Sequence, residues 1–218
     1  VIQKEDLIIL SKCALFKDIG DIDALINEFK GSISEHSKGE IIKEVSSPVE
    51  LIILLKGSAV IYSDDYLGNR SIINRISAGD IFGGAHIFSG TNSYITEMVT
   101  TEQTRLLSIK KDYIDSAESK NAKIFLSNAL TLISEKCLFF LEKNTILSKR
   151  KIRERVLAYL SDISKKQNSK YIRIPFNRQE LADYLGVDRS ALSIELSKMK
   201  KEGLIDYRKN DFKIKSAE

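Results

Sequence analysis

The segment RSALSIELSK, residues 189–198, carries polar side chains at helical intervals. If it forms a helix, Leu192, Leu196 and Met199 share its inward face. Its outward face then carries Arg189, Ser190, Ser193, Ile194, Ser197 and Lys198. An arginine there can donate two parallel hydrogen bonds to guanine O6 and N7, and a serine can contact a base or a phosphate. These residue types favour the reading of DNA bases.

The residues just before this segment contain the signals of a preceding helix and a turn. Asn177 can cap a helix, and Glu180, three residues on, can return the bond to the cap N–H. Gly186 suits the turn, and Asp188 can cap the next helix. The pattern predicts a helix-turn-helix, in which the second helix enters a major groove.

Flanking residues extend the expected DNA-binding module. Arg178 and Gln179 begin the first helix and suit phosphate contacts that set register. The segment LIDYRKNDFKI, residues 204–214, alternates apolar and polar residues around a turn, which predicts a β-hairpin wing. The alternative is a small helical bundle with a solvated basic face. Capping, turn, apolar spacing and wing together favour the DNA-binding module.

A second candidate site is the glycine-rich stretch GDIFGGAHIFSGTNSYITEMV, residues 79–99. Backbone N–H groups at such a turn can cradle an anion. Between Asp80 and Glu97, however, the stretch has no lysine, arginine or other charged side chain. A buried phosphate there would keep an unpaired charge, at a cost of several kcal/mol.

Composition and charge favour a two-part protein that contains a polyanion-binding module. The 218 residues are 43% hydrophobic and 29% charged, with a formal net charge of +4. Residues 145–218 hold 18 Lys and Arg against 10 Asp and Glu, whereas residues 1–144 hold 16 against 20. A basic C-terminal third on an acidic body suggests a nucleic-acid-binding domain joined to another domain.

Export, membrane insertion and metal clusters find no support in the sequence. No run approaches the roughly 18 to 20 apolar residues of a membrane span, and acids interrupt the N-terminal VIQKEDLIIL. Cys13 and Cys137 are too few for a disulfide framework or an iron–sulfur site. We therefore expect a cytoplasmic protein with no membrane partner and no metal.

The hydrophobic period changes along the chain, which indicates an α+β fold. Residues 5–30 look like short helices with polar breaks, and residues 39–110 contain short β-branched runs separated by glycines. Such spacing predicts a compact β-barrel or sandwich.

A long helix is expected next, with an apolar seam of period 3.5, the pattern by which a helix pairs with a copy of itself. The seam contains Leu126, Leu130, Ile133, Cys137, Phe140, Asn144 and Leu147. A second row of Phe125, Ala129, Leu132 and Phe139 could pack on the barrel. A single buried helix with one broad apolar face is the alternative. Asn144 either sets the register or marks where the seam frays.

These motifs together resemble the bacterial Crp–Fnr regulators. RQELADYLGVDRSALS and LSKMKKEGLI look like the family's DNA-binding signature, and KGEII, LLKGSAVIY and GDIFG match the glycine landmarks of its sensor domain. The resemblance implies an α+β protein with a double-stranded, jelly-roll-like β-roll (1–120), a dimerisation helix (121–147) and a winged helix-turn-helix (148–218). It implies a homodimer that binds palindromic operators, contacts RNA polymerase if it is an activator, and is not an enzyme.

The resemblance also assigns roles to particular residues. It implies that Arg189 and Ser193 lie where members of the family read bases. Ile194 stands where many members carry a second base-reading arginine. An isoleucine can touch a thymine methyl group but donates no hydrogen bond, so the half-site is expected to differ.

In members that bind cyclic AMP, a glutamate, an arginine and a serine hold the ligand. The matching positions here are Gly84, Tyr94 and Ile95, so we expect no cyclic nucleotide. The first-ranked expectation is a small organic effector in an apolar pocket between roll and helix, with no effector as a close second. The candidate pocket residues are Gly83, Gly84, His86, Asn92, Tyr94, Ile95, Ile133 and Cys137.

Three other chemistries would use residues of these domains. His86 could serve as an axial ligand if the sensor bound haem, although no cofactor is the primary expectation. Cys137 could be redox-active, but a small apolar packing residue is the more ordinary role. A cupin-like metalloenzyme would need clustered histidines, and the chain has two, His36 and His86, without a His-x-His pair or a glutamate partner.

Overall fold

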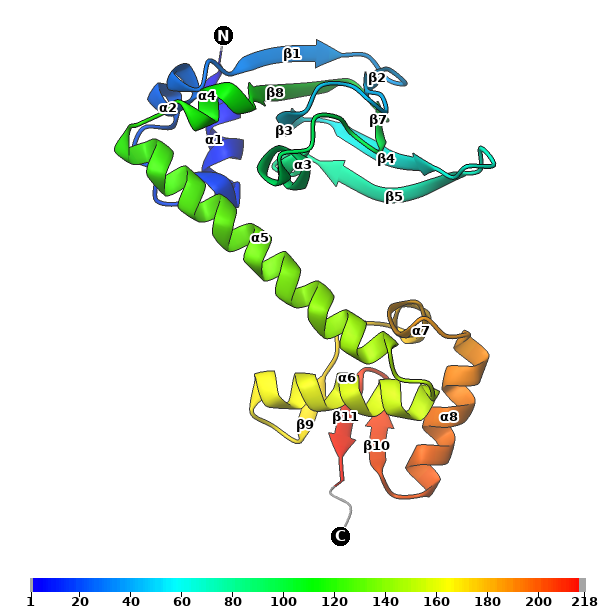
Figure 1. Cartoon of the computed structure of the whole chain (residues 1–218). Helices are drawn as coiled ribbons and strands as arrows, with labels where there is room; N and C mark the ends of the chain where they lie inside the picture. The colour runs from blue at the N-terminus through cyan, green and yellow to red at the C-terminus, as the bar shows by residue number, and fades with distance from the viewer. Residues whose placement is uncertain (1, 216–218) are drawn as a thin grey trace. The chain divides into compact units, whose positions relative to one another are not determined.

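The computed structural model describes residues 2–215, which divide between Glu135 and Lys136 into two compact units (Figure 1). The boundary falls inside one continuous helix, α5 (Lys120–Leu147). The first unit combines two β-sheets with short helices, and the second is a winged helix-turn-helix. The expected α+β fold class is confirmed.

Two four-stranded antiparallel sheets build the first unit. One has the strand order β1-β8-β3-β6 and the other β2-β7-β4-β5. The strands are β1 (Ser32–His36), β2 (Ile41–Lys43), β3 (Glu50–Lys56), β4 (Ser58–Asp64), β5 (Arg70–Ser77), β6 (Ile81–Phe82), β7 (Glu97–Thr100) and β8 (Thr104–Lys110). Gly57, at a φ of +84°, separates β3 from β4. A Cβ there would lie 2.5 Å from the Gln103 carbonyl oxygen, so the close approach requires glycine.

Strand β3 is buried on both faces, which explains its unbroken apolar run. Ile52 and Leu54 face the second sheet, in a core that includes Phe82, Tyr94 and Met98. The alternating residues Leu51, Ile53 and Leu55 pack against the helical layer. A strand covered on both faces needs no polar alternation.

The helical layer comprises α1 (Lys4–Lys12), the 3-10 turn η1 (Ala14–Phe16), α2 (Ile22–Glu28), α4 (Lys111–Asp115) and the start of α5. Phe125 of α5 is fully buried and makes edge-on ring contacts with Phe16 and Phe29, at centroid distances of 5.4 and 5.0 Å. The amide of Asn128 donates to the carbonyls of Leu15 and Lys17. These contacts attach the first turns of α5 to the rest of the first unit, which is called the sensor unit below because the family resemblance implies a sensor domain there.

The short helix α3 (Gly84–Ser89) lies in the stretch that the sequence presented as a glycine loop. Gly83 and Gly90, at φ values of +82° and +74°, stand immediately before and after it. Six residues are too few for a helical period to show in the sequence, so the flanking left-handed glycines are its main local signal.

Helix α5 carries exposed apolar side chains over most of its length. Those exposed include Leu126, Leu130, Ile133, Leu138, Phe139, Phe140 and Leu141. By length and composition alone, α5 could cross a membrane, with a mean hydropathy of 1.5 over its best window. The expectation that no run is apolar enough was therefore wrong by these two criteria. One such helix is weak evidence for a span, and Glu135 and Lys136 place charges at its middle.

The second unit begins with the end of α5 and continues with α6 (Ile152–Gln167), β9 (Tyr171–Arg173), α7 (Arg178–Leu185), α8 (Arg189–Lys201), β10 (Ile205–Arg208) and β11 (Asp211–Ile214). The three strands form an antiparallel sheet in the order β10-β11-β9. Strands β10 and β11 form the expected wing hairpin, with Arg208 paired to Asp211 next to the turn. A buried core that includes Leu160, Ile172, Leu181, Leu196 and Phe212 holds the unit together.

Candidate nucleic-acid interface

The two helices of the helix-turn-helix, α7 and α8, begin at the expected capping residues. Asn177 Oδ1 accepts from the backbone N–H groups of Gln179 and Glu180, and Glu180 Oε2 accepts from Asn177 N at 2.7 Å. Asp188 Oδ1 accepts from the backbone N–H groups of Ser190 and Ala191, two and three residues further along the chain. Each capping side chain therefore satisfies two of the free N–H groups at its helix start.

Helix α8 divides into a buried and an exposed face. Leu192, Leu196 and Met199 are fully buried, whereas Ile194 is 70% exposed. Arg189, Ser190, Ser197 and Lys198 are also exposed, and Ser193 is half-buried. Within residues 2–215, the Arg189 guanidinium makes no hydrogen bond or ion pair, so its donors are available to a ligand.

Arg178, expected at a phosphate, is engaged with the wing. Its guanidinium lies over the rings of Tyr207 and Phe212, at 5.1 and 5.4 Å, and donates to the Lys209 carbonyl at 3.1 Å. Burial lowers its pKa from the ordinary arginine value. Arg178 thus holds the wing turn against the start of α7. Its neighbour Gln179 donates to Asp183 Oδ1, and phosphate contacts by both residues stay predictions.

Arg155 has a positioning role that sequence reasoning missed. Its Nε donates to the Lys149 carbonyl at 2.9 Å, and its Nη1 donates to the carbonyls of Leu185 and Gly186 at 2.9 and 3.0 Å. It thereby links the segment after α5 to the turn between α7 and α8. A Cβ at Gly186 would lie 3.4 Å from Leu147 Cδ2, so the end of α5 also packs close to this turn. In the sequence, Arg155 was one member of a basic run.

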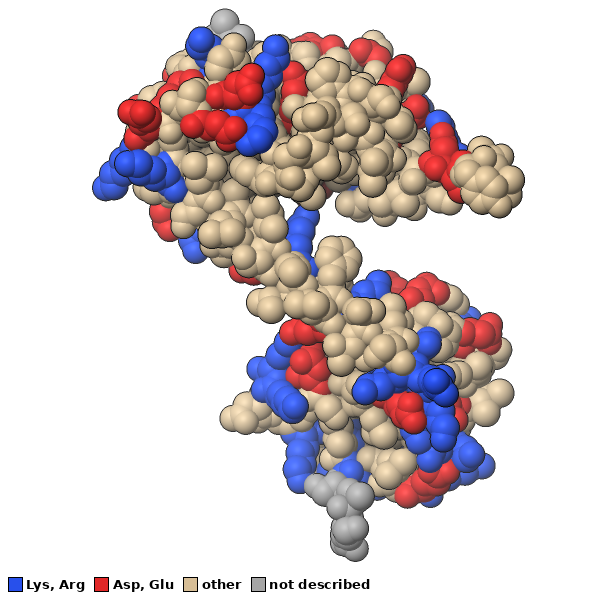
Figure 2. Space-filling view, viewed as in Figure 1, with Lys and Arg blue, Asp and Glu red and all other residues tan. Residues whose placement is uncertain are grey.

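Arg153 connects α6 to the recognition helix. Its guanidinium forms ion pairs of 2.7 Å with Glu195 of α8 and with Glu202 just after it. Two arginines of the basic run 149–155 are therefore structural, while Lys149, Arg150 and Lys151 are exposed. Figure 2 shows Lys and Arg side chains spread over this unit, with acidic residues between them.

An aromatic cluster fills the space between the end of α5, α6 and α7. Tyr184 contacts Phe139, Tyr159 and Phe176 at centroid distances of 6.5, 5.2 and 5.0 Å, and Lys143 lies over its ring. The suggestion that Phe139 packs on the barrel was therefore wrong, because its ring contacts α7 instead. Burial raises the pKa of Tyr159 to about 12, and its hydroxyl has no hydrogen-bond partner among the described residues.

In the sensor unit, Tyr94 fills the position where the resemblance places a phosphate-binding arginine. The side chain is 1% exposed and stacks on Phe82 at 4.8 Å. Its hydroxyl accepts from Glu50 N at 2.9 Å and donates to the Glu50 carbonyl at 2.5 Å. Burial raises its pKa to about 12, so it stays neutral at physiological pH. A Cβ at Gly83 would lie 3.0 Å from this hydroxyl, which shows how tightly the site is packed.

The other expected effector residues are scattered in exposure and surroundings. His86 packs edge-on against Tyr94 at 5.4 Å, whereas Ile95 is 73% exposed. Surface hollows lie along the end of α5 and beside the start of β8, and neither is lined by any residue of 83–95. The structure therefore brings Gly83, His86 and Tyr94 together, but as a packed cluster.

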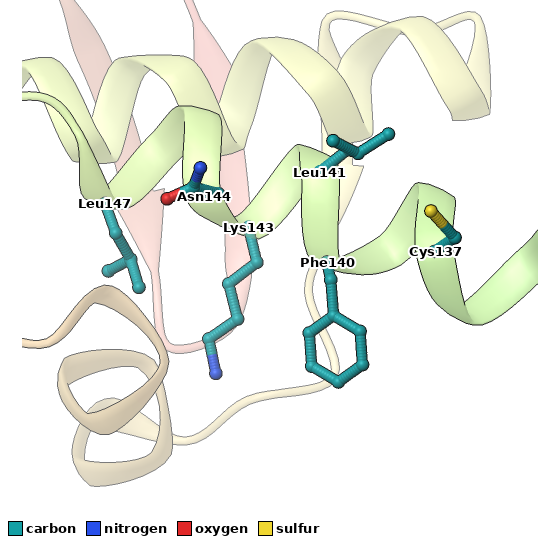
Figure 3. Close-up of a pocket in the computed structure, with 6 residues that line it drawn as sticks. All are labelled: Cys137, Phe140, Leu141, Lys143, Asn144 and Leu147. Carbon is teal, nitrogen blue, oxygen red and sulfur yellow. The ribbon is translucent and has the colours of Figure 1, made fainter. Parts of the chain in front are cut away.

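The larger hollow, of about 530 Å³, lies along the last turns of α5 (Figure 3). It is lined by Cys137, Phe140, Leu141, Lys143, Asn144 and Leu147. In Figure 3, Phe140, Lys143 and Leu147 project to one side of the helix. Four of the six lining residues belong to the predicted seam. Cys137 is exposed within the single chain, whereas Cys13 is buried and burial raises the pKa of its thiol.

The histidines do not form part of a metal-ligand cluster in the described chain. His36 Nδ1 lies 2.5 Å from Glu40 Oε1 and Nε2 lies 2.8 Å from the Ser34 hydroxyl. The expectation that His36 lacks a glutamate partner was wrong, because Glu40 follows at the turn after β1. Across residues 2–215, no group of three His, Cys, Asp or Glu is placed to hold a metal ion.

Replacing Tyr94 by alanine is expected to destabilise the sensor unit by about 3–5 kcal/mol, the usual cost of removing a buried large aromatic side chain. The Glu50 backbone also loses its side-chain partner. Urea unfolding measures the change, and Ile95→Ala, at a 73% exposed neighbour, is the matched control with an effect within about 0.5 kcal/mol. Equal midpoints for Tyr94→Ala and the wild type would show that Tyr94 fills no core position.

Comparisons with known families match both units. Residues 34–121 match the cyclic nucleotide-binding domain, and residues 154–218 match the Crp-like helix-turn-helix domain. The two matches fall on the β-roll and on the winged helix-turn-helix described above.

Individual relatives support the same assignment over much of the chain. Electron transport regulator A of Shewanella oneidensis is 23% identical over 177 residues, covering 78% of this chain and 70% of its own. The probable transcriptional regulator flp of Lacticaseibacillus casei is 24% identical and covers 94% and 92%. The crystal structure of the Thermus thermophilus catabolite activator protein shares the fold, with a TM-score of 0.55 and 16% identity over 93% of each chain. With a β-roll, a long helix and a capped helix-turn-helix in this order, the chain belongs to the Crp/Fnr family of transcription regulators.

Proposed function

We propose that the protein is a homodimeric, sequence-specific DNA-binding regulator that pairs through α5 and responds to a signal other than a cyclic nucleotide. The observation that carries the proposal is the exposed apolar face of α5, at spacings that match a self-pairing helix. Leu130 and Phe140 are 67% and 63% exposed in the single chain. A contiguous apolar surface of this kind marks an interaction site.

Dimerisation would set the spacing between two recognition helices. Two recognition helices related by a two-fold axis reach successive major grooves on one face of DNA when they lie about 34 Å apart. The operator is then an inverted repeat. Selection of bound DNA from a random pool tests dimerisation and DNA reading together, because a symmetric dimer enriches inverted repeats.

The packed cluster around Tyr94 argues against binding of a cyclic nucleotide. A cyclic phosphate at Tyr94 would meet no cation and would have to displace a buried ring from Phe82. Adding cyclic AMP is therefore expected to leave the thermal unfolding midpoint unchanged. A ligand that binds only the folded chain must raise it, by an amount that grows with concentration over Kd. A dose-dependent rise of the midpoint would show that the chain binds cyclic AMP and would contradict this interpretation.

A different small molecule is proposed as the effector, acting through α5. A ligand switches the dimer only if it binds one arrangement of the helices better than the other. The hollow on α5 has the volume of a small-molecule site, although it lies on the predicted seam. The same thermal measurement against a panel of metabolites and haem tests for an effector, and a panel without a shift favours a ligand-blind regulator.

Contact with RNA polymerase is proposed only if the protein activates transcription. The proposed compartment is the bacterial cytoplasm, where its DNA lies.

A further inference from the structure

The serine hydroxyls on the exposed face of α8 have their hydrogens engaged within the helix. Ser193 Oγ donates to the Arg189 carbonyl and Ser197 Oγ donates to the Ser193 carbonyl, each at 2.9 Å. Ser190 Oγ donates to Asp188 Oδ1. Because a hydroxyl has a single hydrogen, these side chains present lone pairs to a ligand and no free donor.

The charged side chains near these serines differ in whether they already have a hydrogen-bonding partner. Glu195 is held by Arg153, so its carboxylate is already paired. Arg189, at the start of the helix, makes no side-chain hydrogen bond or ion pair within residues 2–215, so its donors stay available. Between Arg189 and Lys198, the exposed face therefore offers acceptor oxygens and one large apolar group, Ile194.

Ile194 is a large apolar side chain on the exposed face of the helix. It is 70% exposed, while Leu192 and Leu196 on either side of it are fully buried in the core. The core of the unit therefore has no use for its side chain. If α8 enters a major groove, Ile194 is the group that meets the base edges near the middle of the helix.

We propose that Ile194 selects a thymine in each half-site by packing on the thymine 5-methyl group. This inference rests on the proposed DNA-binding function. Thymine is the base that presents a methyl group in the major groove, whereas guanine presents two acceptors that need donors. A guanine edge against Ile194 would lose water without gaining a partner, which costs free energy. Arg189 supplies the donors for a guanine elsewhere in the same half-site.

The experiment uses the full chain and a duplex selected by it from a random pool. Each thymine of one half-site is replaced in turn by deoxyuridine, which removes only the methyl group, and binding is measured. One position is expected to lose affinity by roughly three- to fivefold, the factor that corresponds to burial of a single methyl group. Ile194→Ala is expected to abolish the sensitivity at that position and at no other.

A matched control separates this role from general effects. Ile73→Ala removes another exposed isoleucine, at 59% exposure in the sensor unit, and should leave the deoxyuridine profile unchanged. An unchanged thermal midpoint for Ile194→Ala would show that the variant is folded. The proposal is overturned if no thymine is sensitive, or if Ile194→Ala retains the wild-type profile while still binding the duplex. Failure to enrich any duplex would instead overturn the proposed DNA-binding function and this inference with it.

Discussion

Replacing Arg189 by alanine is expected to weaken binding to the preferred operator by roughly 5- to 150-fold, or about 1–3 kcal/mol, and to relax specificity at one base pair. The structure leaves the guanidinium exposed and without a partner in the described chain. Its two donors therefore serve guanine without first breaking an internal contact. Binding measured on the operator and on random DNA, at one salt concentration, gives the specificity ratio.

Two further variants separate base reading from charge. Arg189→Lys keeps the positive charge but lacks the planar donor fork, so it should lose specificity while keeping affinity for random DNA. Arg75→Ala removes an exposed arginine of β5 in the sensor unit and should change neither quantity. An equal loss for Arg189→Ala on specific and random DNA would show that Arg189 contacts phosphate and reads no base.

Leu130→Glu is expected to convert the protein to a monomer and to lower operator affinity by about 10²- to 10⁴-fold, because the second half-site is no longer bound by a linked partner. Leu130 lies in the seam and is 67% exposed, so the substitution buries no charge within the chain itself. In the dimer it would place two carboxylates in an apolar interface. Sedimentation of the free protein measures the change in mass.

Thr131→Glu is the matched control for this variant. Thr131 is the next residue of the same helix, is exposed, and lies away from the seam positions. The introduced charge is identical, so the variant should stay dimeric and should bind its operator. If Leu130→Glu remained a dimer, α5 would not be the pairing surface. If both variants were monomeric, the seam would have been assigned to the wrong face.

Local signals in the sequence predicted the helix-turn-helix well. The capping residues Asn177 and Asp188 and the left-handed Gly186 act within a few residues of themselves, so their spacing specifies the structure. The buried row of α8 followed from its helical period. The β-roll strands were similarly evident, because Gly57 and its counterparts mark turns between apolar runs.

Long-range side-chain contacts were beyond sequence reasoning. Arg155 meets carbonyls 30 and 31 residues away, and Arg178 meets the wing turn 31 residues away. Both look like ordinary basic residues in the sequence, since nothing local distinguishes a paired arginine from a free one. Tyr94 is similar: the loss of the phosphate-binding residues was visible, but not that its hydroxyl bonds to Glu50, 44 residues earlier.

Helix α5 shows how one pattern can admit several interpretations. Its apolar residues satisfy the length and composition of a membrane span, a buried core helix and a pairing helix. Burial of Phe125 and Ala129 in the sensor core, together with the contact of Phe139 with Tyr184, accounts for part of the apolar surface. What remains exposed is the seam face, which the proposed dimer would cover, together with Leu138 and Leu141, which follow seam residues in the sequence.

Selection of DNA by the full chain from a random pool tests the central claim most directly. The account predicts enrichment of an inverted repeat whose half-sites are centred about 10 base pairs, one helical turn, apart. Each half-site should contain a guanine that becomes dispensable in Arg189→Ala. Enrichment of a single asymmetric site would contradict the dimer, and no enrichment over random DNA would contradict sequence-specific binding.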